Sequence, residues 1–184
     1  MNKITIMILI VCTVYVNCTA QLYYTKNGRV SFFSSAPLED IKADNNQVIS
    51  IINVSTGDIQ FSLLNNAFHF KKSVMEIHFN ESYMESTKYP KSSFKGKLND
   101  LSKVNFTVDG NYPVLVSGEL TIHGMTNKVN AAGTISVSAG VITATSKFPV
   151  KLADYKISIP RIVKDNIAEV VDVTVSGVYD KKMN

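Results

Sequence analysis

The residues that could do acid–base or metal chemistry in this chain are three histidines and a scatter of carboxylates. The histidines form neither an HxH nor an HxxxH pair, so a zinc site would need ligands assembled from distant segments. A GxSxG elbow, a Walker-type phosphate loop and a GxGxxG fingerprint are also missing from the sequence. We therefore expect no metal, no cofactor and no catalytic residue. The histidines are His69, His78 and His123, and the carboxylates that could pair with them in space are Glu76, Glu81, Glu85 and Asp154.

His123 belongs to the segment "GELTIHGMTNKV", residues 118–129. Strand alternation points Leu120 and Ile122 to one face and places His123 on the other, just before a turn at Gly124. We interpret His123 as a structural residue that makes a hydrogen bond across this turn or to a neighbouring strand.

The first residues of the chain have the character of an export signal. Lys3 precedes an apolar run over 4–16 that is too short to span a membrane comfortably, and small residues precede a predicted cleavage after Ala20. Lipid attachment at Cys18 is a less favoured alternative, because Asn17 is not the small residue that such processing needs. Residues 1–20 are thus expected to be a signal peptide, and residues 21–184 a single periplasmic or secreted domain.

Cysteine content and charge narrow the function classes. Cleavage after Ala20 removes both Cys12 and Cys18, which excludes a disulfide framework and thiolate chemistry in the mature chain. It also removes the single charge of Lys3 and lowers the formal net charge from +4 to +3. The lysines are scattered, so no nucleic-acid partner is expected, whereas weak attraction to an anionic membrane surface stays open.

Period-two alternation is the strongest structural signal in the mature sequence, and it predicts antiparallel strands with one buried face. Turn signals at 57–58, 109–111 and 139–140 separate the segments. Eight or nine strands at this spacing indicate an all-β sandwich or a closed barrel. The segments are 28–34, 47–54, 58–63, 92–98, 105–108, 114–122, 128–137, 141–150 and 171–177.

Two segments break the alternation. Residues 70–90 place Phe70, Val74, Ile77 and Met84 near helical spacing, which predicts one or two short helices over a barrel end, with Pro90 closing the segment. Residues 152–168 are ambiguous, and Pro160 argues against a central strand there.

Three glycines interrupt apolar strand faces: Gly118, Gly133 and Gly177. Such glycines either relieve strand curvature or leave space for a ligand inside a barrel, and both interpretations favour a barrel over a flat sandwich. The many phenylalanine and methionine side chains are ordinary core residues or the lining of an apolar opening near residues 68–84.

Two motifs carry a resemblance to a known family. The segments "IHFNESYMESTKYPKSSFKGKL" (77–98) and "VSGELTIHGMTNKV" (116–129) resemble the two signature blocks of the YceI-like family of exported bacterial lipid-binding proteins. The resemblance implies an elongated, lipocalin-like antiparallel barrel of about eight strands with short helices near its opening. It also implies binding of polyisoprenoids or other long-chain amphiphiles in an internal tunnel. The final part of the chain departs from the family's common ending at "IPRIV" (159–163), where the length of a bound chain would be read.

The leading hypothesis is a non-enzymatic carrier of a long apolar ligand, a polyisoprenoid or a fatty-chain amphiphile. The alternatives are a lipid-modifying enzyme that uses His78 or His123 with a carboxylate, and a solid-core interaction domain. A homodimer stays open. The expected head-group residues are His78, Tyr83 and either Lys71 or Lys72. The expected ligand-binding residues are His78, Phe79, Tyr83, Met84, Tyr89, Phe94, Phe61, Phe70, Phe106 and Phe148. The expected structural residues of the two motifs are Pro90, Gly118, Leu120, Thr121, His123, Gly124 and Thr126.

Overall fold

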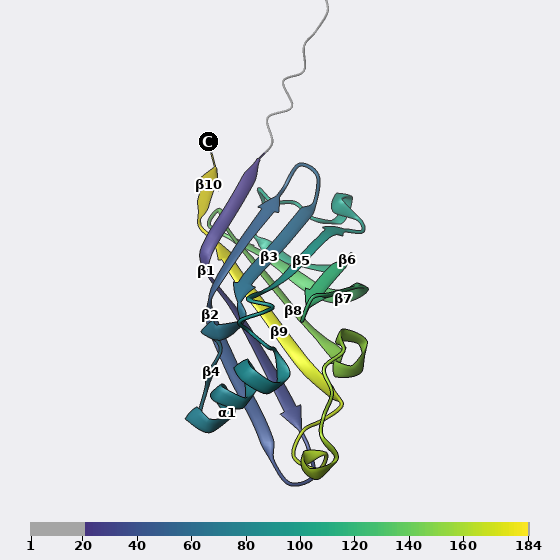
Figure 1. The fold of residues 1–184 in the computed structure, drawn as a ribbon. Helices are drawn as coiled ribbons and strands as arrows, with labels where there is room; N and C mark the ends of the chain where they lie inside the picture. The colour runs from purple at the N-terminus through teal and green to yellow at the C-terminus, as the bar shows by residue number, and fades with distance from the viewer. Residues whose placement is uncertain (1–20, 184) are drawn as a thin grey trace, which may run out of the picture.

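The computed structural model describes residues 21–183, which form a closed antiparallel β-barrel with most of its short helical segments at one end (Figure 1). The predicted signal peptide and its two cysteines lie outside the described residues. No helix within residues 21–183 is long and apolar enough to cross a membrane.

Strands account for most of the fold. Long strands β1 and β2 form a hairpin, β3 follows them, and a short β4 leads into the helical segment. The strands are β1 (Leu22–Ser35), β2 (Asp40–Asn53), β3 (Asp58–Leu64), β4 (His69–Phe70), β5 (Lys91–Leu98), β6 (Gly110–Ile122), β7 (Met125–Ser138), β8 (Val141–Lys151), β9 (Val170–Tyr179) and β10 (Lys181–Met183).

The barrel is built from eight of these strands in the order β1-β9-β8-β7-β6-β5-β3-β2, and pairing of β2 with β1 closes it. Every pairing is antiparallel, from Ser35↔Asp40 at the tip of the first hairpin to Ile142↔Tyr179 between β8 and β9. This arrangement confirms the predicted barrel of about eight strands and excludes the sandwich.

The prediction of a strand at 105–108 is wrong. These residues form a turn between η3 (Leu101–Lys103) and β6. The side-chain oxygen of Asn105 accepts hydrogen bonds from the backbone N–H and the hydroxyl of Thr107, at 3.0 and 2.8 Å. Such a local bond offers the backbone an alternative to pairing with a strand. The alternation of Phe106 and Val108 with Asn105 and Thr107 therefore does not indicate a strand here.

The predicted helical segment forms two short helices, α1 (Ser73–His78) and the π-helix η2 (Phe79–Tyr83). They lie over the end of the barrel that also holds β4 and the β1–β2 hairpin tip (Figure 1). The chain beyond β8 contains the 3-10 helices η4 (Leu152–Tyr155) and η5 (Arg161–Val163) and no strand before β9. The remaining 3-10 helix is η1 (Asn65–Ala67).

The far end of the barrel is filled by side chains. We call this group the closed-end cluster: Ile52, Ile59, Leu98, Val104, Ile135, Val137, Ile142, Ala144 and Tyr179. Two smaller clusters lie toward α1, one around Val150 and Tyr155 and the other around Val48 and Phe68. The protein is therefore packed at one end and lined by separate apolar walls at the other.

Candidate binding cavity

A cavity of about 440 Å³ lies inside the barrel. All eight barrel strands contribute to its wall, together with α1, η2 and residues from the segment between β8 and β9. Its inner end reaches Ile59, Leu98 and Ile135 of the closed-end cluster, and at its other end the exposed side chain of His78 lines it. The cavity thus runs from a packed floor to an opening beside α1.

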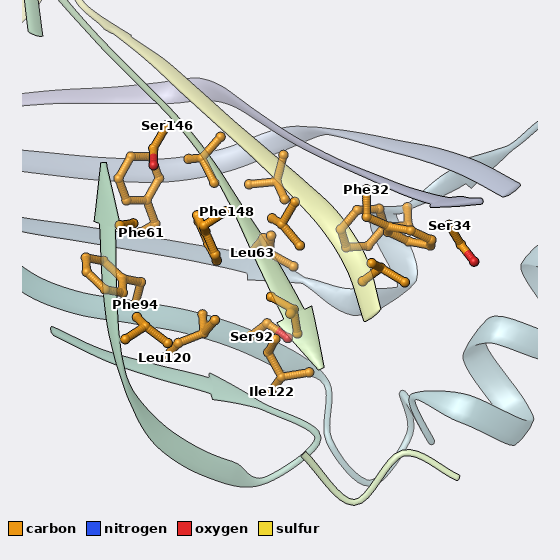
Figure 2. Close-up of a pocket in the computed structure, with 18 of the residues that line it drawn as sticks. Phe32, Ser34, Phe61, Leu63, Ser92, Phe94, Leu120, Ile122, Ser146 and Phe148 are labelled. Atoms are coloured by element: carbon orange, nitrogen blue, oxygen red, sulfur yellow. The ribbon is translucent and has the colours of Figure 1, made fainter. Parts of the chain in front are cut away.

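Strand alternation explains why the wall is apolar. On β6, Val114, Val116, Leu120 and Ile122 all line the cavity, as the sequence pattern predicts for one face of a strand. The same alternation brings the valines of β9 and the inward residues of β8 to the wall. Figure 2 shows side chains from several strands converging on this space.

Phe94 sits over a pair of glycines on the inner wall. Gly96 of β5 is the register partner of Gly118 of β6, and a Cβ on Gly118 would come within 2.6 Å of the Phe94 ring and 2.4 Å of the Lys95 carbonyl oxygen. Because Gly118 has no side chain, the Phe94 ring and strand β5 can come close to the backbone of β6. Gly133 lines the cavity directly, and Gly177 lies against the ring of Tyr179.

Aromatic rings form the wall beneath the helices. The ring of Phe32 lies 5.6–5.8 Å, centroid to centroid, from those of Phe68, Phe70 and Phe79. These separations are typical of favourable aromatic pairs. All four residues line the cavity, so this cluster links β1 and β4 to η2 at the open end.

Polar groups that line the cavity are few, and several lie at the opening. Tyr83 and His78 come from the helical segment, and burial raises the pKa of the Tyr83 phenol, which stays neutral. Glu39 of the hairpin tip also lines the opening and forms an ion pair with Lys72 at 2.6 Å. An apolar chamber with a few polar groups at one end suits an amphiphile.

The structure brings most of the predicted ligand-binding residues to this cavity. Tyr89 and Phe106 are not among its lining residues. The Tyr89 ring packs against His123 instead, at 4.6 Å between centroids, and Phe106 packs against the closed-end cluster. The predicted residues that line the cavity are His78, Phe79, Tyr83, Met84, Phe94, Phe61, Phe70 and Phe148.

The resemblance led us to expect residues 159–163 at the far end of a tunnel, but the segment between β8 and β9 lies at the cavity opening. The residue pattern also did not predict which of its side chains line the cavity. Ile157, Val163, Asn166 and Ile167 line the cavity although this segment has no regular periodicity. The only sequence signal is the recurrence of isoleucine and valine within 157–167. Pattern methods depend on regular elements, so they could not assign these side chains to the interior.

His123 links three segments at the open end of the barrel through its side-chain contacts. Its backbone has a φ of 50° in the turn between β6 and β7. Nε2 lies 2.7 Å from a carboxylate oxygen of Glu85, and Nδ1 lies 3.1 Å from the carbonyl oxygen of Tyr155. Across the same turn, the hydroxyls of Thr121 and Thr126 are hydrogen-bonded at 2.8 Å.

The proximity of Glu85 meets the first requirement of the enzyme alternative, an acid next to a histidine. Neither His123 nor Glu85 lines the cavity, however, and both ring nitrogens of His123 already have partners. His78 does line it, but within residues 21–183 no carboxylate lies within 4.0 Å of its ring nitrogens. Within the same residues, no group of three histidine, cysteine or acidic side chains is arranged to hold a metal.

Two buried asparagines stabilise the cavity wall through hydrogen bonds to backbone carbonyl oxygens. The Asn65 side chain donates to the Tyr89 carbonyl oxygen at 2.7 Å, and its backbone N–H donates to the carbonyl of Pro90. Asn45 donates to the Leu64 carbonyl oxygen at 2.9 Å. Through Asn65, the "KYP" residues of the first sequence motif are held in place, which gives Pro90 a structural role.

A closed antiparallel barrel with a hollow apolar interior and a short helical cover defines the lipocalin-like class of β-barrels. Within that class, the model of the YceI-like domain matches residues 22–179, and the chain belongs to this family. A comparison with curated proteins found no match.

Solved structures share the fold at low sequence identity. A polyisoprenoid binding domain from Saccharophagus degradans, implicated in plant cell wall breakdown, is 17% identical with a TM-score of 0.75, and the match covers 88% of this chain and 98% of that one. BcnA from Burkholderia cenocepacia is 16% identical with a TM-score of 0.67, over 82% and 95%. The Campylobacter jejuni YceI protein is 14% identical with a TM-score of 0.63, over 80% and 87%.

Proposed function

We propose that the protein binds one long apolar molecule inside the barrel and carries it without changing it chemically. The observation that carries this proposal is the apolar cavity of about 440 Å³ that reaches from the closed-end cluster to the opening beside α1. Each methylene group that enters such a space contributes roughly 0.8 kcal/mol. A cavity of this size also argues against the solid-core alternative.

The shape of the lining favours a flexible chain with one polar end. The floor and middle of the cavity are mainly aliphatic and aromatic, with strand residues such as Ser62, Thr134 and Thr145 among them, whereas His78, Tyr83 and Glu39 lie at the opening. We propose that the hydrocarbon tail points toward Phe61 and Phe94, and that the head group lies near His78 and Tyr83. Lys72 is engaged with Glu39, so exposed Lys71 is the more available cation for an acidic head group.

The ligand class that we propose is a polyisoprenoid or a related fatty-chain amphiphile. The Saccharophagus degradans neighbour is described as a polyisoprenoid binding domain, which supports the isoprenoid version. The contact residues in this proposal are His78, Phe79, Tyr83, Met84, Phe94, Phe61, Phe70 and Phe148.

We propose that the carrier works outside the cytoplasm, in the periplasm or as a secreted protein. The apolar run over 4–16 and the small residues before Ala20 support export. An extracytoplasmic carrier of this type would keep a water-insoluble chain from aggregating while it passes between donor and acceptor.

Native mass spectrometry of the protein purified without detergent tests the proposal. The matched variants are Ala131→Phe and Ala132→Phe, because Ala131 is buried against the cavity whereas its neighbour Ala132 is exposed on the outer face. We expect a co-purifying long-chain molecule, or uptake of an added prenyl alcohol, in the parent protein and in Ala132→Phe. In Ala131→Phe, the added phenyl ring should displace a few methylene groups of the ligand from the cavity and so weaken uptake by about tenfold or more.

Three outcomes would count against the proposal. Absence of any bound or added chain in the parent protein would remove the carrier function. Equal uptake by the two folded variants would place the ligand outside the cavity. Recovery of the added molecule in a chemically altered form would favour the enzyme alternative instead.

A further inference from the structure

Four exposed aliphatic side chains surround the opening of the cavity, and we call them the mouth rim: Leu38, Val74, Ile77 and Ile162. Ile162 is 91% exposed and Leu38 is 73% exposed, and these are the highest values among the large exposed hydrophobic residues of the described chain. Val74 and Ile77 of α1 are 54% and 51% exposed. Exposed apolar side chains gathered at one site usually mark an interaction surface.

Hydrogen bonds show that the rim segments adjoin one another. The backbone N–H of Leu38 donates to the carbonyl oxygen of Asp165 at 2.9 Å, which joins the β1–β2 hairpin tip to the loop that carries Ile162. Next to Leu38, Glu39 pairs with Lys72 at 2.6 Å, directly before α1. The hairpin tip, α1 and the η5 loop lie at the same end of the barrel (Figure 1).

In each rim segment, an exposed aliphatic residue is next to one that lines the cavity. Ile162 precedes Val163, and Val74 precedes Met75, and in each pair the second residue lines the cavity. Ile77 precedes His78 in the same way. At Ile162–Val163 and Val74–Met75, apolar residues of the cavity lining are therefore direct chain neighbours of apolar residues on the outside of the protein.

Cations flank this apolar surface. Arg161 and Lys164 stand on either side of Ile162 and Val163, and Lys71 lies before α1; all three are exposed. Within residues 21–183, no carboxylate lies within 4.0 Å of their charged nitrogens. Three carboxylates of the same end are engaged: Glu39 pairs with Lys72, Glu76 faces His69 and Asp40 accepts a hydrogen bond from Ser35. Glu81 of η2, Asp154 of η4 and Asp165 are exposed and form no ion pair within residues 21–183.

We propose that the mouth rim docks on the surface of a bilayer that contains anionic phospholipids, with the aliphatic side chains at the acyl boundary and Arg161, Lys164 and Lys71 at the phosphates. A bilayer fits both features, because it offers apolar depth and negative charge in one surface. Docking in this orientation lets a hydrocarbon chain pass between membrane and cavity without crossing water. A second copy of this chain would instead bring the same three cations together across the interface.

Flotation of the purified protein with vesicles tests the proposal without any cavity ligand. The vesicles are phosphatidylcholine alone and phosphatidylcholine mixed with phosphatidylglycerol. We expect the protein to float with the mixed vesicles. The Arg161→Gln/Lys164→Gln variant should bind them about thirtyfold more weakly, given the contribution of each basic residue near an anionic surface.

Aliphatic variants test the other half of the contact. Leu38→Ser/Ile162→Ser should weaken vesicle binding by about tenfold or more, because two side chains no longer enter the acyl boundary. The matched control is Leu115→Ser/Val178→Ser, which removes side chains that are 58% and 50% exposed on the outer faces of β6 and β9. This control should bind like the parent protein. Both pairs are exposed, so the variants should keep the unfolding midpoint of the parent.

The result that would overturn the proposal is equal flotation of the parent protein and of either rim variant, or no flotation of the parent protein. Equal binding to neutral and mixed vesicles would overturn the role of anionic lipid. Concentration-dependent dimerisation that Leu38→Ser/Ile162→Ser abolishes, without vesicle binding, would make the rim a dimer interface instead. Ala131→Phe should still float, which separates failure of docking from failure of ligand binding.

Discussion

The imidazole Nε2 of His123 lies 2.7 Å from a carboxylate oxygen of Glu85, 38 residues away in the chain. The other ring nitrogen faces the carbonyl oxygen of Tyr155 in η4. Through these two contacts, the β6–β7 turn is linked to the loop after η2 and to the segment that follows β8. These are the two segments that border the cavity opening, so this histidine stabilises the opening without contacting its contents.

We expect His123→Ala to lower the free energy of unfolding by about 1.5–3 kcal/mol, because a side chain that is 10% exposed loses its contacts with two acceptor oxygens, the Glu85 carboxylate and the Tyr155 carbonyl, at least one of which receives a ring N–H. Glu85→Ala should cost less, since the Glu85 side chain is 43% exposed and water replaces its partner. Urea unfolding of the single and double variants measures the coupling. Lys88→Ala, which removes a 3.9 Å contact to Glu85, is the control. An unchanged free energy of unfolding in His123→Ala would contradict the role of His123 in linking these segments.

Gly118 and Gly140 make a matched pair of glycines for a second prediction. A Cβ on Gly118 would lie 2.4 Å from the Lys95 carbonyl oxygen and 2.5 Å from the Cα of Gly96, so the backbone of β5 must move. We expect Gly118→Ala to cost about 3 kcal/mol, at the upper end of overpacking effects. A Cβ on Gly140 meets nothing within 4 Å, and only its φ of 79° opposes Gly140→Ala, at about 1–2 kcal/mol.

Thermal unfolding of the two glycine variants compares them directly. The larger loss should follow the substitution in the barrel wall. If Gly140→Ala proves the more damaging change, the close approach of β5 and β6 at Gly118 is not as tight as the structure has it.

The third prediction concerns two buried hydroxyl groups, that of Tyr179 in the closed-end cluster and that of Ser50, which is hydrogen-bonded to it. The Ser50 hydroxyl donates to the Gln60 carbonyl oxygen at 2.8 Å, so its 2.6 Å bond with Tyr179 must use the tyrosine proton. Ser50→Ala leaves a fully buried phenol without an acceptor, at a cost of about 1–3 kcal/mol. Tyr179→Phe leaves the serine proton satisfied and should cost about 1 kcal/mol. The double variant should recover part of the Ser50→Ala loss, and additive losses would contradict this hydrogen-bond direction.

Alkaline pH should destabilise the barrel through the same tyrosine. Burial raises the pKa of the Tyr179 phenol well above its ordinary value, although the bond to Ser50 lowers it slightly. The unfolded chain then loses the phenol proton at lower pH than the folded protein does. Stability is complete below about pH 10, the unfolded pKa. It falls by up to about 1.4 kcal/mol per pH unit from this residue as pH rises toward the folded pKa.

Urea unfolding between neutral pH and pH 11 measures this dependence. Tyr179→Phe should flatten the alkaline decline, and Tyr83 and Tyr155, whose pKa values burial also raises, should account for a smaller remaining part. An unchanged decline in Tyr179→Phe would show that other groups control it.

The barrel could be predicted from the sequence because its central strands alternate clearly, as in Val171 to Val175 of β9. The beginning of β2 could not, since Asp40, Lys42 and Asp44 have low strand propensity and are held extended by pairing with β1 and, at Asp44, with β4. Residues 105–108 were assigned wrongly because two apolar residues suffice to imitate alternation.

Predictions about the cavity were limited by a different ambiguity. A glycine on an apolar face signals either close approach or empty space, and only the positions of neighbouring side chains separate the two. Gly118 is covered by Phe94, whereas Gly133 borders the cavity and also closely approaches β8, since a Cβ there would lie 2.6 Å from the Thr145 carbonyl oxygen. The tertiary position of Tyr89, behind the wall and against His123, likewise depends on contacts that no local pattern encodes.

A crystal structure of the protein saturated with a long prenyl alcohol tests the central proposal most directly. We predict continuous elongated density inside the barrel, from Phe32 at the opening to Phe61 and Phe94 near the floor (Figure 2). The hydroxyl end of the alcohol should lie toward His78 and Tyr83. An interior without ligand density in a crystal whose protein has demonstrably bound the alcohol, or density on the outer face of the strands, would contradict it.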